Sequence, residues 1–178
     1  VDAPFAVDGK PYVLIDTAGL RHRRKINTSA DQFGLMRAER SIRECDVAVL
    51  VLDAMDGVTN QDKKIGGQIA DAARGCVILV NKWDLAAEQE AKRRNRKKDF
   101  RELYLEALRR ELFFLDWATV LFVSAKTGAG VTQLFKAIDV IGDEMQRRVE
   151  TPQLNRVVGR AIASYAPPFV HGKRFKAL

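Results

Sequence analysis

Three short polar motifs each follow directly after an apolar run that is typical of a strand. They are Asp16-Thr17-Ala18-Gly19, Asn81-Lys82-Trp83-Asp84 and Ser124-Ala125-Lys126. Taken alone, each motif is most simply a turn, because Asp, Asn and Gly are ordinary turn residues. Their order and separations, 65 residues from Asp16 to Asn81 and 40 from Asp84 to Ser124, make chance a poor explanation.

The second and third motifs have the chemistry to bind guanine. A carboxylate such as Asp84 can accept from both the ring N–H and the exocyclic amine of guanine, whereas adenine would leave it unpaired. Asn81 can tie neighbouring loops together, the Lys82 stem can cover a ring face, and the Ala125 N–H can donate to the guanine oxygen. We therefore expect the base to be held by Asn81, Lys82, Asp84, Ser124, Ala125 and Lys126.

The first motif suits phosphates and a magnesium ion. The Asp16 carboxylate can occupy the outer shell of a Mg²⁺ that bridges two phosphates, through a water molecule. Gly19 has no side chain, so its backbone N–H can approach a terminal phosphate closely. We expect Asp16, Thr17, Ala18 and Gly19 to line the nucleotide site.

The elements that must position these motifs alternate between strands and helices. Continuous apolar runs, typical of strands buried on both faces of a parallel sheet, are Val47–Asp53, Cys76–Val80 and Thr119–Val123. Helical patterns cover Asp31–Glu44, Thr59–Arg74 with Gly75 as its stop, a long charged stretch Glu88–Leu112, and Val131–Arg148. Phe5–Asp16 predicts a hairpin that turns at Asp8-Gly9. We expect a doubly wound α/β domain, with ligands at the carboxyl ends of the strands.

Composition narrows the class of protein. The 178 residues carry a formal charge of +7 and are 47% hydrophobic, which is typical of a globular chain. The apolar runs are too short to span a bilayer, so we expect no membrane partner. Cys45 and Cys76 are most simply buried thiols in a reducing cytosol, which favours a cytoplasmic location.

The last 28 residues differ from the rest. They hold five Lys and Arg and no Asp or Glu, and they begin with Thr151-Pro152, a pattern in which Thr caps a helix and Pro takes its first position. We place a domain boundary here, which predicts one domain over residues 1–150 and the start of another over 151–178.

The three motifs together resemble translation-factor-class P-loop GTPases, and longer stretches narrow the resemblance. Ile15–Leu20 with its basic loop, Asp53–Asp62 and Val80–Leu85 are similar to bacterial Der (EngA) GTPases. The tail, with Ala166-Pro167-Pro168 and Gly172-Lys173-Arg174, resembles the opening of the KH-like domain that ends Der proteins. The resemblance implies a P-loop NTPase-type G domain, the second of two in tandem and truncated at its N-terminus. A C-terminally truncated start of the α+β KH-like domain would follow.

The same resemblance implies a function. A Der-like protein would hydrolyse GTP to GDP and phosphate with Mg²⁺. It would bind the large ribosomal subunit and its rRNA during assembly, next to an upstream first G domain. Asp16 and Gly19 would read the terminal phosphate.

Two parts of a complete GTPase are missing from the sequence. No Gly-x-x-x-x-Gly-Lys-[Ser/Thr] occurs, so the phosphate cradle is absent. The resemblance places the lost first strand between the strand ending at Asp16 and Val47–Asp53, which leaves inner strands without a ladder partner. We expect the 178-residue chain alone to be unstable, to bind GTP weakly or not at all, and to be inactive.

Leu20 stands where many GTPases place a water-orienting Gln, so we assign no catalytic residue within this chain. Der belongs to a group with a hydrophobic residue at this position. Relatives in that group can use K⁺ near the phosphates, which makes K⁺ dependence a hypothesis here.

The basic segments leave two interpretations open. Arg21–Lys25 is either a solvated loop or a nucleotide-sensitive contact to RNA or to the neighbouring domain. Lys92–Lys98 is either a solvated helix face or a contact to rRNA. The tail shows no GXXG loop of the kind with which KH domains clamp RNA, so protein docking is its alternative role.

Two other functions compete with the leading one. The protein could be a non-hydrolysing pseudo-GTPase or RNA-binding scaffold that never had a phosphate loop. It could also be another GTPase of the same group, such as an Era-like protein. The sequence upstream of Val1 would separate all three.

Overall fold

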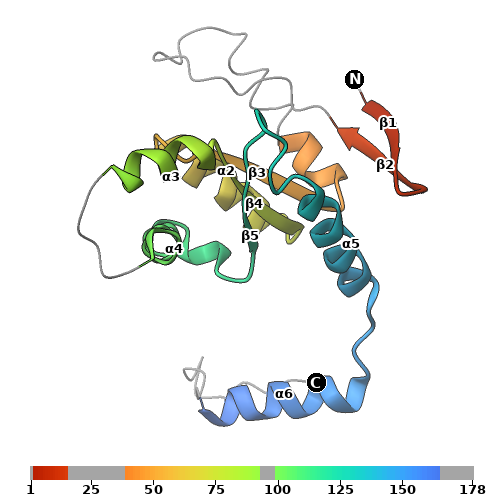
Figure 1. Cartoon of the computed structure of the whole chain (residues 1–178). Coiled ribbons are helices and arrows are strands. Elements are labelled where there is room, and N and C mark those ends of the chain that lie inside the picture. Colours follow the sequence, from red (N-terminus) through yellow and green to blue (C-terminus); the bar gives the residue numbers. More distant parts are fainter. Residues whose placement is uncertain (1, 16–38, 93–98, 165–178) are drawn as a thin grey trace, which may run out of the picture. The chain divides into compact units, whose positions relative to one another are not determined.

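The computed structural model describes residues 2–15, 39–92 and 99–164 (Figure 1). The motif Asp16–Gly19, Leu20, the basic loop Arg21–Lys25, most of Lys92–Lys98 and the tail from residue 165 lie outside these ranges. The chain divides into two compact units, Val1–Met145 and Gln146–Leu178, and each is described by itself.

A three-stranded parallel sheet forms the centre of the first unit. Its order is β3 (Val47–Asp53), β4 (Gly75–Asn81) and β5 (Thr119–Phe122), so the three predicted strands are confirmed (Figure 1). The register pairs Asp53 with Asn81, which brings the ends of β3 and β4 side by side. All three carboxyl ends therefore meet at one edge, where ligands of parallel sheets bind.

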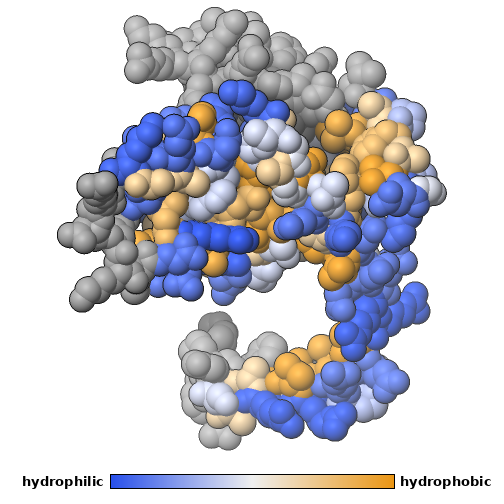
Figure 2. Space-filling view, in the orientation of Figure 1, coloured by the Kyte–Doolittle hydropathy of each residue, from blue (hydrophilic) through white to orange (hydrophobic). Residues whose placement is uncertain are grey.

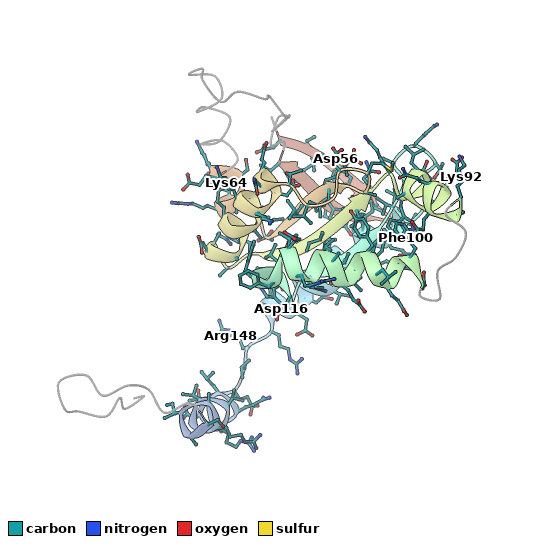
Figure 3. All side chains as sticks on the ribbon, turned by 90° about the vertical axis from the view of Figure 1, so that its left-hand side faces the viewer. Asp56, Lys64, Lys92, Phe100, Asp116 and Arg148 are labelled. Carbon is teal, nitrogen blue, oxygen red and sulfur yellow. The ribbon has the colours of Figure 1, made fainter. Side chains whose placement is uncertain are left out.

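Helices α2 (Asn60–Asp71) and α4 (Phe100–Glu111) lie in front of the strands in Figure 3. The core on this face includes Leu52, Ile69, Ile78, Leu108, Leu112 and Leu115, each exposed by 2% or less. The short helix η1 (Phe113–Leu115) supplies the last of these, and residues 39–44 are also helical.

Among the described residues, strand β3 is covered on one face only, so the predicted burial on both faces is not found there. Leu50 and Leu52 are buried, whereas Val49 and Val51, which alternate with them, are 37% and 53% exposed. Successive side chains of a strand point to opposite faces, so a continuous apolar run cannot reveal which face has a cover. Strand β4, in contrast, is buried almost throughout.

Helix α2 begins as predicted and ends earlier. The Thr59 side chain accepts from the Asp62 N–H, and the Asp62 carboxylate accepts from the Thr59 N–H at 2.8 Å, which is a capping box. The helix ends at Asp71, so the prediction that Gly75 stops it is wrong, because Gly75 opens β4. A Cβ at Gly75 would lie 2.5 Å from Cγ2 of Ile141, so the glycine allows helix α5 (Thr132–Gln146) to approach the strand.

The predicted long helix Glu88–Leu112 is wrong, because two helices occupy this stretch. Helix α3 (Trp83–Ala91) starts within the second motif, at Trp83, and α4 starts after Asp99. The Asp99 backbone is extended, and its side chain accepts from the Arg101 N–H at 3.0 Å. An aspartate at this position starts a new helix.

The predicted hairpin is confirmed as β1 (Asp2–Val7) and β2 (Lys10–Ile15), which turn at Asp8 and Gly9. Its side chains meet α5. The Phe5 and Tyr12 rings lie 5.8 and 5.4 Å from that of Phe135. The Asp139 carboxylate accepts from Lys10 Nζ at 2.7 Å and from the Tyr12 hydroxyl at 2.8 Å.

Helix α6 (Thr151–Ser164) belongs to the second unit, and Figure 2 shows hydrophobic residues along one side of it. It starts one residue earlier than predicted. The Glu150 carbonyl accepts from the N–H groups of Gln153 and Leu154, so Thr151 is the first helical residue instead of the cap. No described helix combines the length and the hydrophobicity that crossing a bilayer requires.

Candidate nucleotide-binding site

The second and third motifs lie together at the carboxyl edge of the sheet. The Ala54 N–H donates to the Asn81 carbonyl at 2.9 Å, and the Trp83 N–H donates to the Val123 carbonyl at 3.0 Å. These bonds continue the strand pairing into the loops that carry the motifs. They hold the loop after β4 between the ends of β3 and β5.

Asn81 joins the two motifs directly. Its side-chain Oδ1 accepts from the Ala125 N–H at 2.9 Å, across 44 residues of chain. The same N–H is the one that the sequence assigns to the guanine oxygen. In this structure it is engaged by Asn81, so a bound base would have to share it.

Ser124 shapes its loop from inside. Its side chain is buried, and Oγ accepts from the Thr127 N–H at 3.3 Å. Its N–H donates to the Ala129 carbonyl, and its own carbonyl accepts from the Gly128 N–H. Ala125 and Lys126 are exposed at the tip of this loop. Ser124 thus organises the loop that presents its two neighbours.

Gly130 closes this loop, and the motif analysis did not identify it. Its φ is +77°, and a Cβ there would lie 2.6 Å from the Phe122 carbonyl oxygen. Both conditions favour glycine. The only signal in the sequence is the Gly-Ala-Gly that follows Thr127.

Asp84 lies in the first turn of α3 and is half-buried. Within the described part of the chain, its carboxylate has no hydrogen-bond or ion-pair partner. The N-terminus of a helix interacts favourably with negative charge, so this position suits a carboxylate.

Lys82 connects β4 to α3 in a left-handed backbone conformation, with φ 61° and ψ 30°. Its Nζ lies 2.5 Å from Oδ2 of Asp53, at the end of β3. Burial works to raise the pKa of Asp53, but the hydrogen bonds from Lys82 and from the Met55 N–H lower that pKa below its ordinary value. The bond to Asp53 in turn raises the pKa of Lys82. The sequence marks Asp53 as the carboxylate that ends an apolar run and opens the Asp53–Asp62 stretch, and gives it no role in the site.

Trp83, to which the sequence assigns no base contact, belongs to an aromatic cluster. Its ring stacks on Phe100 at 5.0 Å and 8°, and lies 5.3 Å from Tyr104 and 4.3 Å from Phe122. Figure 3 labels Phe100 at the start of α4. The cluster connects α3, α4 and β5, and so fixes the element that carries Asp84.

A pocket formed by described residues lies away from the motifs. A cavity of about 260 Å³ is lined by residues that include Ile42, Arg43 and Arg74, which precede β3 and β4. It lies at the amino ends of the strands, opposite the motifs. We assign it no part in the nucleotide site.

The phosphate side of the site falls outside the described ranges. Strand β2 ends at Ile15, directly before the Asp16–Gly19 motif. The described residues include no group of three or more His, Cys, Asp or Glu that could hold a metal ion. The Mg²⁺ assignment of Asp16 therefore stays a prediction.

Comparison with known proteins identifies the family. The elongation factor Tu GTP binding domain matches residues 5–142. The chain belongs to this family. The three-dimensional fold is similar to that of Era in the crystal structure of Era in complex with MgGDPNP and a 16S ribosomal RNA fragment. The match covers 77% of this chain and 42% of the Era chain, with a TM-score of 0.58 and 18% sequence identity. The expected P-loop NTPase-type G domain is thus confirmed as the fold.

The similarity to Der is also confirmed along the chain. "GTPase Der" of Pelotomaculum thermopropionicum is 39% identical over 176 residues, 99% of this chain and 38% of the relative. "GTPase Der" of Prochlorococcus marinus is 41% identical over 174 residues, 98% of this chain and 36% of the relative. The chain therefore spans little more than a third of the length of these GTP-binding relatives.

Proposed function

We propose that this chain is the guanine-reading part of a Der-like GTPase, which hydrolyses GTP to GDP and phosphate. The observation that carries the proposal is the Asn81–Ala125 hydrogen bond. It unites two sequence motifs beside the Asp84 carboxylate, which is unpaired among the described residues. The similarity to GTPase Der along nearly all of the chain supports it.

Each residue at the edge has a role in this proposal. Asp84 accepts from the guanine ring N–H and exocyclic amine, and the Ala125 N–H donates to the guanine oxygen. The Lys82 stem covers one ring face. Asn81 joins the two loops through its bond to the Ala125 N–H, and Ser124 shapes its own loop through its bond to the Thr127 N–H. Lys126 adds positive charge at the exposed tip.

The phosphate side rests on residues outside the described ranges. Asp16 would hold Mg²⁺ through water and Gly19 would approach the terminal phosphate, with Thr17 and Ala18 forming the turn between them. Mg²⁺, when bound, neutralises charge that develops on the phosphates. Leu20 cannot orient water, so K⁺ is our candidate for additional charge stabilisation. Equal hydrolysis rates of the whole protein in Na⁺ and K⁺ would exclude that role.

The wider assignment follows the same similarity. We propose that residues 1–150 are a second G domain and that residues 151–178 begin a KH-like domain. An upstream G domain, the large ribosomal subunit and rRNA would be the partners, in the cytoplasm. The Era structure contains a fragment of 16S ribosomal RNA, so a protein with a related fold is seen with ribosomal RNA. No described feature favours the scaffold without hydrolysis.

A change of base specificity tests the proposal. In the whole protein, Asp84→Asn replaces one acceptor oxygen with an NH₂ donor, which suits the C2 carbonyl of xanthine better than the amine of guanine. We expect weaker GDP binding, by roughly 10- to 100-fold, and a gain in affinity for xanthosine diphosphate, both measured by calorimetry.

Glu88→Gln is the matched control, because it removes a carboxylate from the same helix, one turn further on. Glu88 pairs with Lys92 on the exposed face. We expect this variant to bind GDP like the unsubstituted protein. An Asp84→Asn variant with unchanged preference for GDP would disprove the assignment of guanine to this edge.

A further inference from the structure

Asp53 lies beside the proposed base pocket and belongs to none of the three motifs. It ends β3, and its register partner is Asn81, the residue before Lys82. The Lys82 Nζ lies 2.5 Å from Asp53 Oδ2, with the Lys82 side chain 52% exposed and that of Asp53 25% exposed. The pair thus runs along the carboxyl edge of the sheet.

Both ends of this ion pair are constrained. The second carboxylate oxygen of Asp53, Oδ1, accepts from the Met55 N–H at 2.9 Å, which fixes the orientation of the group. The Lys82 backbone is held in its left-handed conformation between β4 and α3. Four carbon atoms of lysine side chain must therefore bridge from the end of β4 to the end of β3.

A free lysine at an exposed position would extend its ammonium into water and sample many rotamers, at a cost in entropy when it is ordered. Fixing the ammonium at Asp53 instead lays the apolar stem along the carboxyl edge of the sheet, from the end of β4 to the end of β3. That is the surface on which the proposed function places the guanine ring.

We propose that Asp53 is a positioning residue for guanine, because it holds the Lys82 stem in the place where the stem covers the base. The inference rests on the proposed function and adds a residue to it. Asp53 touches no nucleotide atom in this proposal and acts only through Lys82. Asp56, which also raises the pKa of Lys82 through its charge, provides a nearby carboxylate for comparison.

The substitution Asp53→Asn separates the two contacts of the side chain. The amide keeps an oxygen that can accept from the Met55 N–H, and loses the charge that pairs with Lys82. Lys82→Met keeps an apolar stem and loses the ammonium. The whole protein should be measured with each substitution, with both, and with Asp56→Asn, using GDP affinity by calorimetry and thermal unfolding as readouts.

We expect Asp53→Asn to weaken GDP binding roughly two- to fivefold, the range of a half-exposed ion pair. In the Lys82→Met background, the same substitution should cause no further loss, because the group through which it acts is gone. Asp56→Asn should bind GDP like the unsubstituted protein.

Two results would overturn the inference. An equal loss in both backgrounds would mean that Asp53 supports the loop after β3 and does not act through Lys82. Unchanged or tighter binding in Asp53→Asn alone would mean that the pair does not help the base to bind. Failure of the unsubstituted protein to bind GDP is a separate result, because it would disprove the proposed function itself.

Discussion

At the scale of single residues, the loop that presents Ala125 and Lys126 depends on two glycines with different surroundings. Gly128 and Gly130 have φ values of +80° and +77°, but only Gly130 approaches a backbone atom, the Phe122 carbonyl oxygen. Alanine at Gly128 would meet nothing within 4 Å. An alanine substitution at Gly128 would therefore test backbone strain alone, whereas one at Gly130 would test strain together with a steric collision.

We expect Gly128→Ala to lower the free energy of unfolding by about 1–2 kcal/mol, the cost of a left-handed conformation for a residue with a Cβ. Gly130→Ala should lower it further and should also weaken GDP binding, because the loop must move away from β5. Urea unfolding and GDP calorimetry on the whole protein measure both effects. Equal stabilities of the two variants would contradict the collision at Gly130.

Residues that carry chemistry through their own side chains were the easiest to predict. Asn81 and Asp84 are recognisable because spacing along the chain places them after an apolar run. Asp53 and Gly130 were missed, because their roles arise from a neighbour across the sheet, Lys82 or the Phe122 carbonyl. Such pairings depend on register, which local sequence does not encode.

At the scale of elements, the hairpin of β1 and β2 is joined to α5 by one carboxylate. Asp139 accepts from both Lys10 and Tyr12, and the rings of Phe5 and Phe135 pack alongside. Replacing Asp139 by Ala removes both polar contacts and leaves the aromatic ones. We expect faster amide hydrogen exchange in the hairpin and unchanged exchange in β4, measured by mass spectrometry.

The same link has a predictable pH dependence. Hydrogen bonds from Lys10 and then Tyr12 hold the pKa of Asp139 below its ordinary value of 3.8. A depressed pKa stabilises the native state above the ordinary value, and this contribution is lost as the pH falls through the lowered one. Protection of the hairpin should therefore persist at mildly acidic pH and decline only below about pH 4. Loss of protection already near pH 6 would contradict this assignment.

Elements were predicted well where an apolar pattern defines them, as for all three strands of the sheet. The prediction of a single helix over Glu88–Leu112 was wrong because the many charged residues of this stretch give no sign of a break. The second helix begins after Asp99, whose side chain accepts from the Arg101 N–H. The prediction that Gly75 stops a helix was wrong for a different reason. A glycine that stops a helix and one that admits a neighbouring helix look alike in sequence.

At the scale of the whole molecule, the sheet has an open side. Val49 and Val51 on β3, and Val13 and Leu14 on β2, are exposed apolar side chains of the first unit. Within the described ranges, β2 and β3 belong to separate sheets. The expectation that a lost first strand lies between them stays a prediction.

We therefore expect the purified 178-residue chain to bind GTP weakly or not at all, and a longer chain that adds about 40 upstream residues, enough for a strand, a loop and a helix, to bind it tightly. The longer chain should also unfold at a higher temperature, because it covers the exposed valines. Isothermal calorimetry and differential scanning calorimetry measure the two effects. Nanomolar affinity of the 178-residue chain would disprove the expectation.

The alternation of strands and helices was enough to predict the fold class, whereas the one-sided cover of β3 was not predictable. Burial of a face depends on which elements are present around it. The pattern Val47–Asp53 is that of a strand with a cover on both sides, and this structure describes the cover on only one.

The position of Trp83 in the aromatic cluster also allows its intrinsic fluorescence to report on the nucleotide site. Trp83 directly precedes Asp84 in the chain, and its ring stacks against Phe100. Trp117, the other tryptophan of the chain, is 52% exposed and belongs to the turn before β5. Replacing Trp117 by Phe would leave Trp83, next to the proposed base pocket, as the single indole of these 178 residues. Excitation of that indole could then pass to a fluorescent nucleotide by resonance energy transfer, so occupancy could be followed in real time without attaching a dye to the protein.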